Sequence, residues 1–124
     1  MAEKFDNGLS LAQTERLVIL VEELTESAKA ACKVLRWGYE SKNPATPDTP
    51  TNRKHLEIEL GDVVNAVAML GDSGDLNMGS ILTAAALKAE IIGQFTNYQE
   101  AAYESEELLP SKILETQIRM FEPS

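Results

Sequence analysis

The chain has 124 residues, of which 44% are hydrophobic, and a formal net charge of −9. This length suits one compact domain with its own core, and the negative charge argues against binding of a nucleic-acid polymer through a basic face. Single copies of cysteine and histidine exclude an intrachain disulfide and a metal site built from two histidines. We expect a cytoplasmic protein without membrane attachment, because the sequence shows neither a signal-peptide pattern nor an apolar run of roughly 20 residues.

A long first helix is predicted from Leu11 to Trp37, before Gly38. Ser10 and Gln13 have the spacing of a capping box at its start. Cys32 and an apolar stripe with three- and four-residue spacing are expected to face the core. The stripe consists of Leu17, Val21, Leu24, Ala28, Ala31 and Leu35.

Carboxylates fall on the far side of this first helix. Glu23 and Glu26 lie within a second apolar stripe, whereas Glu22 points toward a side that carries basic residues. The second stripe contains Ile19, Ala30, Val34 and Trp37. Carboxylates among apolar neighbours are costly unless they are paired or bind a metal, so Glu23 and Glu26 become candidate ligands.

A loop with three prolines follows at residues 38–52, and loops of this length often carry function. Thr51 or Asn52 is expected to cap a second helix, at about residues 53–70. Its predicted core stripe is Leu56, Leu60, Val63, Val67 and Leu70. Glu59 and Asp62 are bordered by apolar residues, as in the first helix. Gly61 costs about 1 kcal/mol relative to alanine, and a close helix contact is one reason to keep it.

A third helix is predicted from about Asn77 to Tyr98. It is apolar nearly all round, which is typical of a helix buried in a bundle or an oligomer interface. A last short helix is expected at residues 111–121, after Pro110. The sequence thus predicts an all-α bundle of about four helices, as a single domain over residues 1–124. Its core spans residues 10–98, and residues 99–124 form a C-terminal extension.

The two carboxylate pairs, Glu23 with Glu26 and Glu59 with Asp62, share one spacing. Residues three apart lie on one helix face, one turn from each other. Either pair alone is more typical of a solvated acidic stripe. Four carboxylates brought together would repel one another unless a hard cation such as Mg²⁺ lay among them.

The motifs around these pairs resemble a known family. The segment Glu22-Glu23-Leu24-Thr25-Glu26, followed after the loop by Glu57-Ile58-Glu59-Leu60-Gly61-Asp62, is similar to the signature E-E-x-x-E then E-x-x-D. This signature belongs to the MazG-like branch of the all-α nucleoside triphosphate pyrophosphohydrolase superfamily. The resemblance covers roughly residues 13–98, and residues 36–41 and 51–53 share in it.

The resemblance implies an enzyme that hydrolyses nucleoside triphosphates, including deoxynucleotides, between the α- and β-phosphates. It implies a homodimer or homotetramer, and Mg²⁺, with Mn²⁺ as a substitute. The metal ligands implied by position are Glu23, Glu26, Glu59 and Asp62. Glu22 is the implied catalytic residue, which orients or deprotonates the attacking water. Candidate substrate-binding residues, each of which also has a packing or solvation interpretation, are Lys88, Asn65, Trp37 and Arg53.

Two other classes fit parts of the pattern. A non-catalytic helical module that binds a nucleotide, a metal or a protein partner would keep the bundle without turnover. A ferritin-like di-iron protein would need Glu-x-x-His pairs, and no histidine follows Glu23 or Glu59 at that spacing. We therefore rank the di-iron protein below the non-catalytic module.

Overall fold

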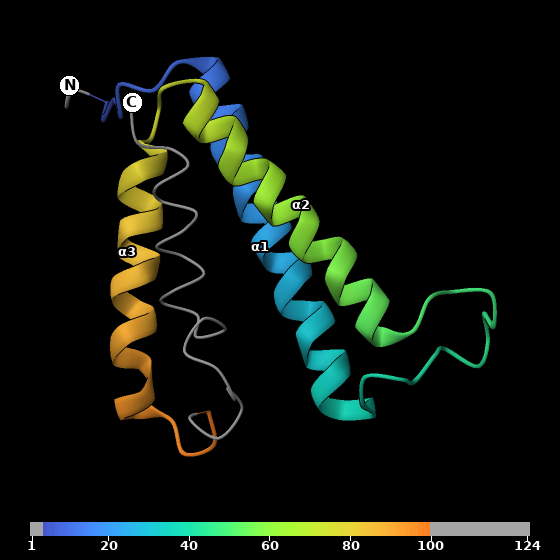
Figure 1. The fold of residues 1–124 in the computed structure, drawn as a ribbon. Coiled ribbons are helices and arrows are strands. Elements are labelled where there is room, and N and C mark those ends of the chain that lie inside the picture. The colour runs from blue at the N-terminus through green and yellow to red at the C-terminus, as the bar shows by residue number, and fades with distance from the viewer. Residues whose placement is uncertain (1–3, 100–124) are drawn as a thin grey trace. The chain divides into compact units, whose positions relative to one another are not determined.

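The computed structural model describes residues 4–99, which are all-α, as predicted. They form three α-helices, α1 (Leu11–Trp37), α2 (Asn52–Asp72) and α3 (Met78–Ile91), and the short 3-10 helix η1 (Ile92–Phe95) (Figure 1). Within this described range there is no strand, and no helix is long and apolar enough to span a membrane. The helix predicted at residues 111–121 lies outside the described residues.

The chain divides into two compact units, Met1–Asp75 and Leu76–Ser124. Helices α1 and α2 belong to the first unit, and α3 and η1 belong to the second. The carboxylate pairs and the long loop therefore all lie within the first unit. The prediction of a single domain over residues 1–124 stays a prediction.

The ends of α1 follow the predicted capping signals. The Ser10 hydroxyl accepts from the Gln13 N–H at 3.0 Å, and the Gln13 side chain accepts from the Ser10 N–H at 2.8 Å. This confirms the capping box. Gly38 ends the helix with φ of +87°, a conformation that glycine adopts without strain, and its N–H donates to the Val34 carbonyl.

Helix α2 begins where the sequence places it. Its N-cap is Thr51, whose hydroxyl accepts from the Lys54 N–H at 3.2 Å. This bond satisfies one of the four N–H groups that a helix leaves free at its start. The predicted bounds of about residues 53–70 thus fall short of the observed helix, Asn52–Asp72, by one or two residues at each end.

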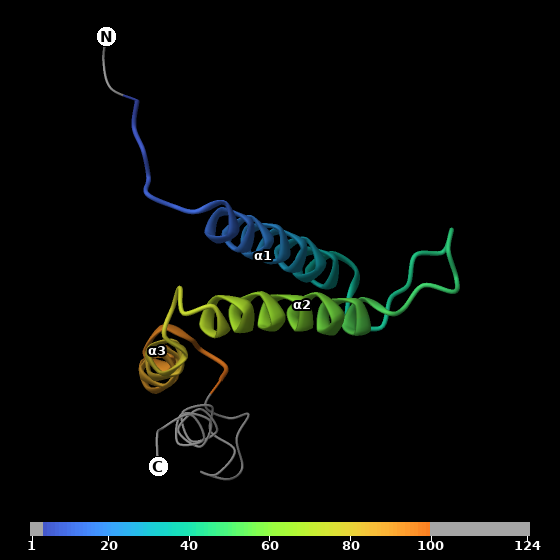
Figure 2. The ribbon, with the colours of Figure 1, turned by 90° about the horizontal axis from the view of Figure 1, so that it is seen from above.

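Helices α1 and α2 form an antiparallel hairpin and lie side by side along most of their length (Figures 1 and 2). The side chains between them are buried or half-buried and alternate at intervals of three and four residues, as in a coiled coil. We call these residues the seam. On α1 the seam comprises Gln13, Arg16, Leu20, Glu23, Ser27, Ala30 and Val34, and on α2 it comprises Asn52, Leu56, Glu59, Val63, Ala66 and Leu70.

The core stripe predicted on α1 was wrong. Val21 is 62% exposed, Leu35 is 86% exposed, and Cys32 is exposed as well. The seam instead uses small residues, and Ala30 and Ala66 are each only 1% exposed. Small side chains allow two helix backbones to approach closely, so α2 packs on this face and leaves the stripe of larger apolar residues uncovered within the hairpin.

Helix α3 starts as predicted but ends early. The Asn77 side chain accepts from the Ser80 N–H at 2.8 Å and so caps the helix. The α-helix ends at Ile91 rather than at Tyr98, and η1 follows. Two consecutive β-branched residues and Gly93 have weak helix propensity at this point, which fits the tightening into a 3-10 turn.

An ion pair closes the hairpin at the end away from the loop. Arg16 Nε lies 2.6 Å from one Asp75 carboxylate oxygen, and Arg16 Nη2 lies 3.2 Å from the other. Both side chains are largely buried. The hydrogen bond from Arg16 holds the pKa of Asp75 below its usual value. The pair thus ties the turn after α2 to the first turns of α1.

Asp75→Asn tests whether the ion pair between Arg16 and Asp75 stabilises the hairpin. Because the folded pKa of Asp75 is lowered, its stabilisation is present above the unfolded pKa of about 3.9 and is lost as the pH falls through the folded value. The variant should unfold at lower urea concentration than the native chain at pH 7, and the difference should shrink in acid. Asp72→Asn, at an exposed position on the last turn of α2, is the matched control. Equal midpoints at pH 7 would contradict a stabilising pair.

Gly61→Ala tests the expectation of a close contact at this glycine. A Cβ built at Gly61 meets no atom within 4 Å, so the structure does not support that expectation. The substitution should therefore raise the free energy of unfolding by about 0.5–1 kcal/mol, measured by urea titration of the helical circular-dichroism signal. A loss of stability would show that Gly61 faces a neighbour after all.

Candidate metal centre

Three carboxylates converge in the middle of the hairpin. Glu23 comes from α1, and Glu59 and Asp62 come from successive turns of α2. One ligand oxygen of each lies within 4.8 Å of the other two. Glu23 and Glu59 are half-buried seam residues, whereas Asp62 is exposed. We call these three residues the acidic triad.

The triad is electrostatically crowded. Burial raises the pKa of Glu23, and the negative charges of Asp62 and Glu59 raise it further. The negative charges of Glu22 and Glu26 act in the same direction. The charged form of Glu23 is thus disfavoured by its surroundings. A bound cation would favour that charged form and so offset both causes.

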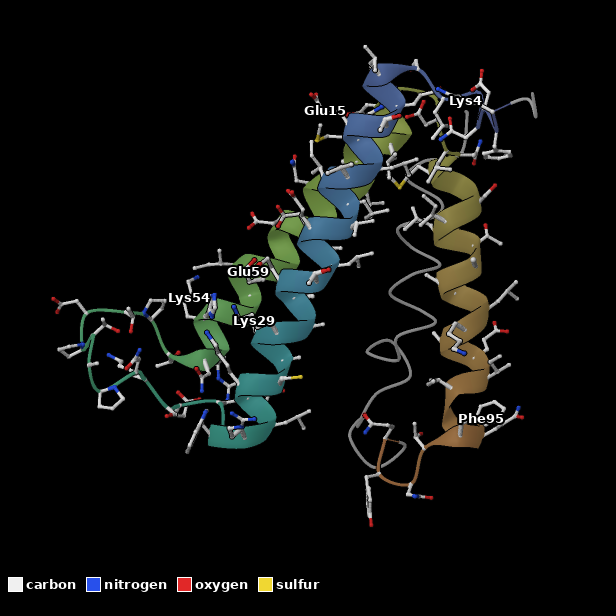
Figure 3. The ribbon with its side chains drawn as sticks, turned by 180° about the vertical axis from the view of Figure 1, so that it is seen from behind. Lys4, Glu15, Lys29, Lys54, Glu59 and Phe95 are labelled. Atoms are coloured by element: carbon white, nitrogen blue, oxygen red, sulfur yellow. The ribbon has the colours of Figure 1, made fainter. Side chains whose placement is uncertain are left out.

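Glu59 has a partner on its own helix. The His55 ring nitrogen Nε2 lies 3.1 Å from a Glu59 oxygen, one helical turn away, and both side chains are partly buried. Figure 3 shows Glu59 between the two helices, with Lys29 and Lys54 farther toward the loop. This hydrogen bond restricts the orientation of the Glu59 carboxylate, as partners behind metal ligands commonly do.

The donor set fits a hard divalent cation. Carboxylate oxygens are the ligands that Mg²⁺ prefers, and Mg²⁺ keeps several of its waters, so three protein oxygens suffice. Ser27, one turn after Glu23 on the same face, is buried, and its hydroxyl has no hydrogen-bond partner in the described part of the chain. A buried hydroxyl without a partner is costly, so a polar ligand that reached it would gain a hydrogen bond.

Glu26 and Glu22 lie outside the triad, and both are exposed. Three residues along a helix correspond to a turn of about 300°, which places Glu26 about 60° away from Glu23 and off the seam. The structure therefore brings together three of the four ligands implied by the resemblance. The roles of Glu26 as a ligand and of Glu22 as the catalytic residue stay predictions.

The four predicted substrate-binding residues occupy different surroundings. Trp37 lines a pocket at the loop end of the hairpin. Arg53 donates to Glu40 at 2.8 Å, and its guanidinium lies 4.3 Å from the centre of the Tyr39 ring, so it is already paired. The remaining two are exposed: Asn65 on α2 and Lys88 on α3, in the second unit.

The pocket that Trp37 lines has a volume of about 760 Å³. Its walls come from the last turns of α1, the loop and the first turn of α2, and they include Lys33, Lys42 and His55. Sequence reasoning missed this pocket. The available signal was His55, which stands four residues before Glu59 and so shares its helix face.

Backbone hydrogen bonds hold the long loop at its base. The Asn52 N–H donates to the Ser41 carbonyl at 2.9 Å, and the Arg53 N–H donates to the Tyr39 carbonyl at 2.8 Å. The Asn52 side chain also donates to the Gly38 carbonyl at 3.0 Å. Residues 38–41 are thus held against the start of α2, which fixes the positions of Ser41 and Asn52 in the pocket wall.

Comparisons of the chain with models of protein families, with curated proteins and with solved structures found no match.

Glu23→Gln tests the triad as a metal site. At a Mg²⁺ concentration of 100 times Kd, binding should stabilise the native chain by about 2.7 kcal/mol, which raises Tm by several degrees. Glu23→Gln should lose most of this gain. Without divalent ions at neutral pH, the same variant should be at least as stable as the native chain, because a carboxyl with a raised pKa destabilises the fold as the pH rises through that pKa.

Glu57→Gln is the matched control for this experiment, because Glu57 is exposed on α2 and outside the triad. It should keep the full Mg²⁺-dependent rise in Tm. If Mg²⁺ raises Tm equally in the native chain, Glu23→Gln and Glu57→Gln, the ion binds elsewhere.

Proposed function

We propose that this protein is a Mg²⁺-dependent nucleoside triphosphate pyrophosphohydrolase that accepts ribo- and deoxyribonucleotides. The observation that carries the proposal is the convergence of Glu23, Glu59 and Asp62 from two helices, at the positions where the signature resemblance implies ligands. The raised pKa of Glu23 supports it, because a cluster that disfavours its own charge is suited to a cation.

The proposed hydrolysis needs few groups from the protein besides the metal ligands. Bound Mg²⁺ would neutralise phosphate oxygens and lower the pKa of a coordinated water. The chain itself positions the substrate, since phosphoryl transfer depends mainly on positioning and electrostatics. His55 orients Glu59, and the seam fixes Glu23 on the opposite helix.

The proposed reaction is attack of water on the α-phosphorus. The bond from that phosphorus to the oxygen bridging to the β-phosphate breaks, and the products are a nucleoside monophosphate and pyrophosphate. The choice of this bond rests on the family resemblance. Glu22, which is exposed and precedes Glu23 on α1, is the proposed group that orients the water or takes its proton.

The exposed apolar stripe on α1 supports an oligomer. Val21, Leu24 and Leu35 are all at least half exposed in the hairpin. Contiguous apolar side chains of this kind mark interaction surfaces. We propose a homodimer or homotetramer, as the family resemblance implies, and its mass is measurable by light scattering after gel filtration.

A non-catalytic module that binds a nucleotide or a metal is the second candidate. The position of Glu26 favours it, because this fourth signature carboxylate is exposed and outside the triad. Such a protein would bind Mg²⁺ and nucleotides but would release no pyrophosphate. Turnover therefore separates the two candidates.

The deciding experiment incubates the full chain with a panel of nucleoside and deoxynucleoside triphosphates, with and without Mg²⁺. Pyrophosphate and phosphate are measured separately. Pyrophosphate release that needs Mg²⁺ supports the proposal. No pyrophosphate from any substrate would favour the non-catalytic module, and release of phosphate alone would refute cleavage at the α–β bond.

Glu59→Gln should reduce turnover by at least ~100-fold, because even residues behind a metal ligand typically matter by ~10–100-fold. The neighbouring variant Glu57→Gln should keep turnover within about twofold of the native chain, since surface substitutions away from a site have small effects. Circular dichroism should show the same helical signal for both variants. Unchanged turnover in Glu59→Gln would mean that the triad is not the catalytic centre.

A further inference from the structure

Charge changes sign along the hairpin. On α1 a row with three- and four-residue spacing runs from Glu22 and Glu26 to Lys29, Lys33 and Arg36. On α2 the acidic residues also lie farther from the loop than the basic ones. Because the helices are antiparallel, the two basic ends meet beside the loop (Figure 1).

The pocket beside the loop lies in this basic region. Its lining includes Lys33, Lys42 and His55 together with the neutral donors Ser41 and Asn43. No aspartate or glutamate lines it among the residues that the structure describes, although the chain as a whole carries a net charge of −9. The pocket is therefore suited to an anion, with lysines as point charges and hydroxyl and amide groups as hydrogen-bond donors.

The pocket adjoins the acidic triad through one residue. His55 lines the pocket and is hydrogen-bonded to Glu59. Four residues along a helix correspond to ~6 Å along its axis, so the pocket begins about one turn from the triad. The pocket and the triad are thus neighbours on the hairpin, linked by the contact between His55 and Glu59.

We propose that the pocket binds the β- and γ-phosphates of the substrate, with the α-phosphate at the acidic triad. The identity of this ligand rests on the proposed function. The polyphosphate chain would then run from the triad toward the loop end of the hairpin, and the leaving pyrophosphate would be held by Lys33 and Lys42. A neutral nucleobase would gain little from two lysines, whereas each phosphate gains a charge-assisted hydrogen bond.

The hydrogen bonds at the base of the loop support this assignment. Asn52 donates to the Ser41 carbonyl through its backbone N–H and to the Gly38 carbonyl through its side chain, so the protein itself holds the part of the pocket wall that Ser41 and Asn52 form. A preformed site loses less conformational entropy when it binds a ligand. Inorganic pyrophosphate should therefore bind this pocket on its own, without a nucleoside.

Trp37 gives a direct readout, because it lines the pocket and is the only tryptophan in the chain. The experiment titrates the full chain with inorganic pyrophosphate in Mg²⁺ buffer and follows tryptophan emission. Pyrophosphate should change the emission with a saturable curve, and an uncharged nucleoside should not. The double variant Lys33→Ala with Lys42→Ala should weaken pyrophosphate binding by at least ~10-fold, the expected effect of losing a hydrogen bond to a charged group.

Lys29→Ala is the matched control. Lys29 lies one turn before Lys33 on α1, is exposed, and does not line the pocket. This variant should bind pyrophosphate within about twofold of the native chain, as expected for a surface charge outside the site. Equal weakening by Lys29→Ala and by the double variant would show that binding depends only on the general positive charge of this region, and would overturn the proposal.

Two other results would overturn it. Equal pyrophosphate affinity in the native chain and the double variant would show that the lysines do not bind the phosphates. A nucleoside that changes the emission while pyrophosphate does not would assign the pocket to the base. Because the titration measures binding without turnover, its outcome is separable from that of the hydrolysis assay. Turnover without pyrophosphate binding would reject only this inference.

Discussion

Packing along the seam holds the mutually repelling carboxylates of the acidic triad together, and the candidate site depends on it. Glu23 and Glu59 occupy seam positions that a coiled coil normally gives to apolar side chains. The hairpin tolerates them because its close packing lies elsewhere along the seam, at Ala30, Ala66 and Leu70. The fold thus keeps two charged groups where a simple structural hairpin would not, and this placement is itself an argument for function.

The sequence predicted the elements of the hairpin well, and Leu56, Val63 and Leu70 of the predicted α2 stripe do lie in the seam, but the core of α1 was assigned to the wrong face. Helix starts at Ser10, Thr51 and Asn77 follow from side chains that satisfy free N–H groups, which is local chemistry. Burial is not local. The stripe containing Val21 and Leu35 is more apolar than the seam, yet α2 packs on the smaller residues, and periodicity alone does not reveal which of two faces a partner helix chooses.

The candidate site was likewise predicted only in part from the sequence. Spacing on α2 was enough to place Glu59 and Asp62 one turn apart, and the family signature pointed to Glu23 as their partner. Spacing did not reveal that Glu26 lies off the seam, because that depends on how α1 is rotated against α2. The pocket was also missed, since the loop conformation brings Lys42 and His55 into one lining and no periodic pattern encodes that conformation.

The hydrogen bonds at the base of the loop make the position of the helices independent of the length and sequence of the loop. In many binding sites these two properties are coupled. The bonds of Asn52 and Arg53 to residues 38–41 fix where the loop leaves and rejoins the helices, whatever lies between. Lengthening a loop costs little free energy, so residues 42–50 are free to change in number and kind without moving the seam. Ligand preference can therefore diverge during evolution, or be redesigned, while the carboxylate centre stays as it is.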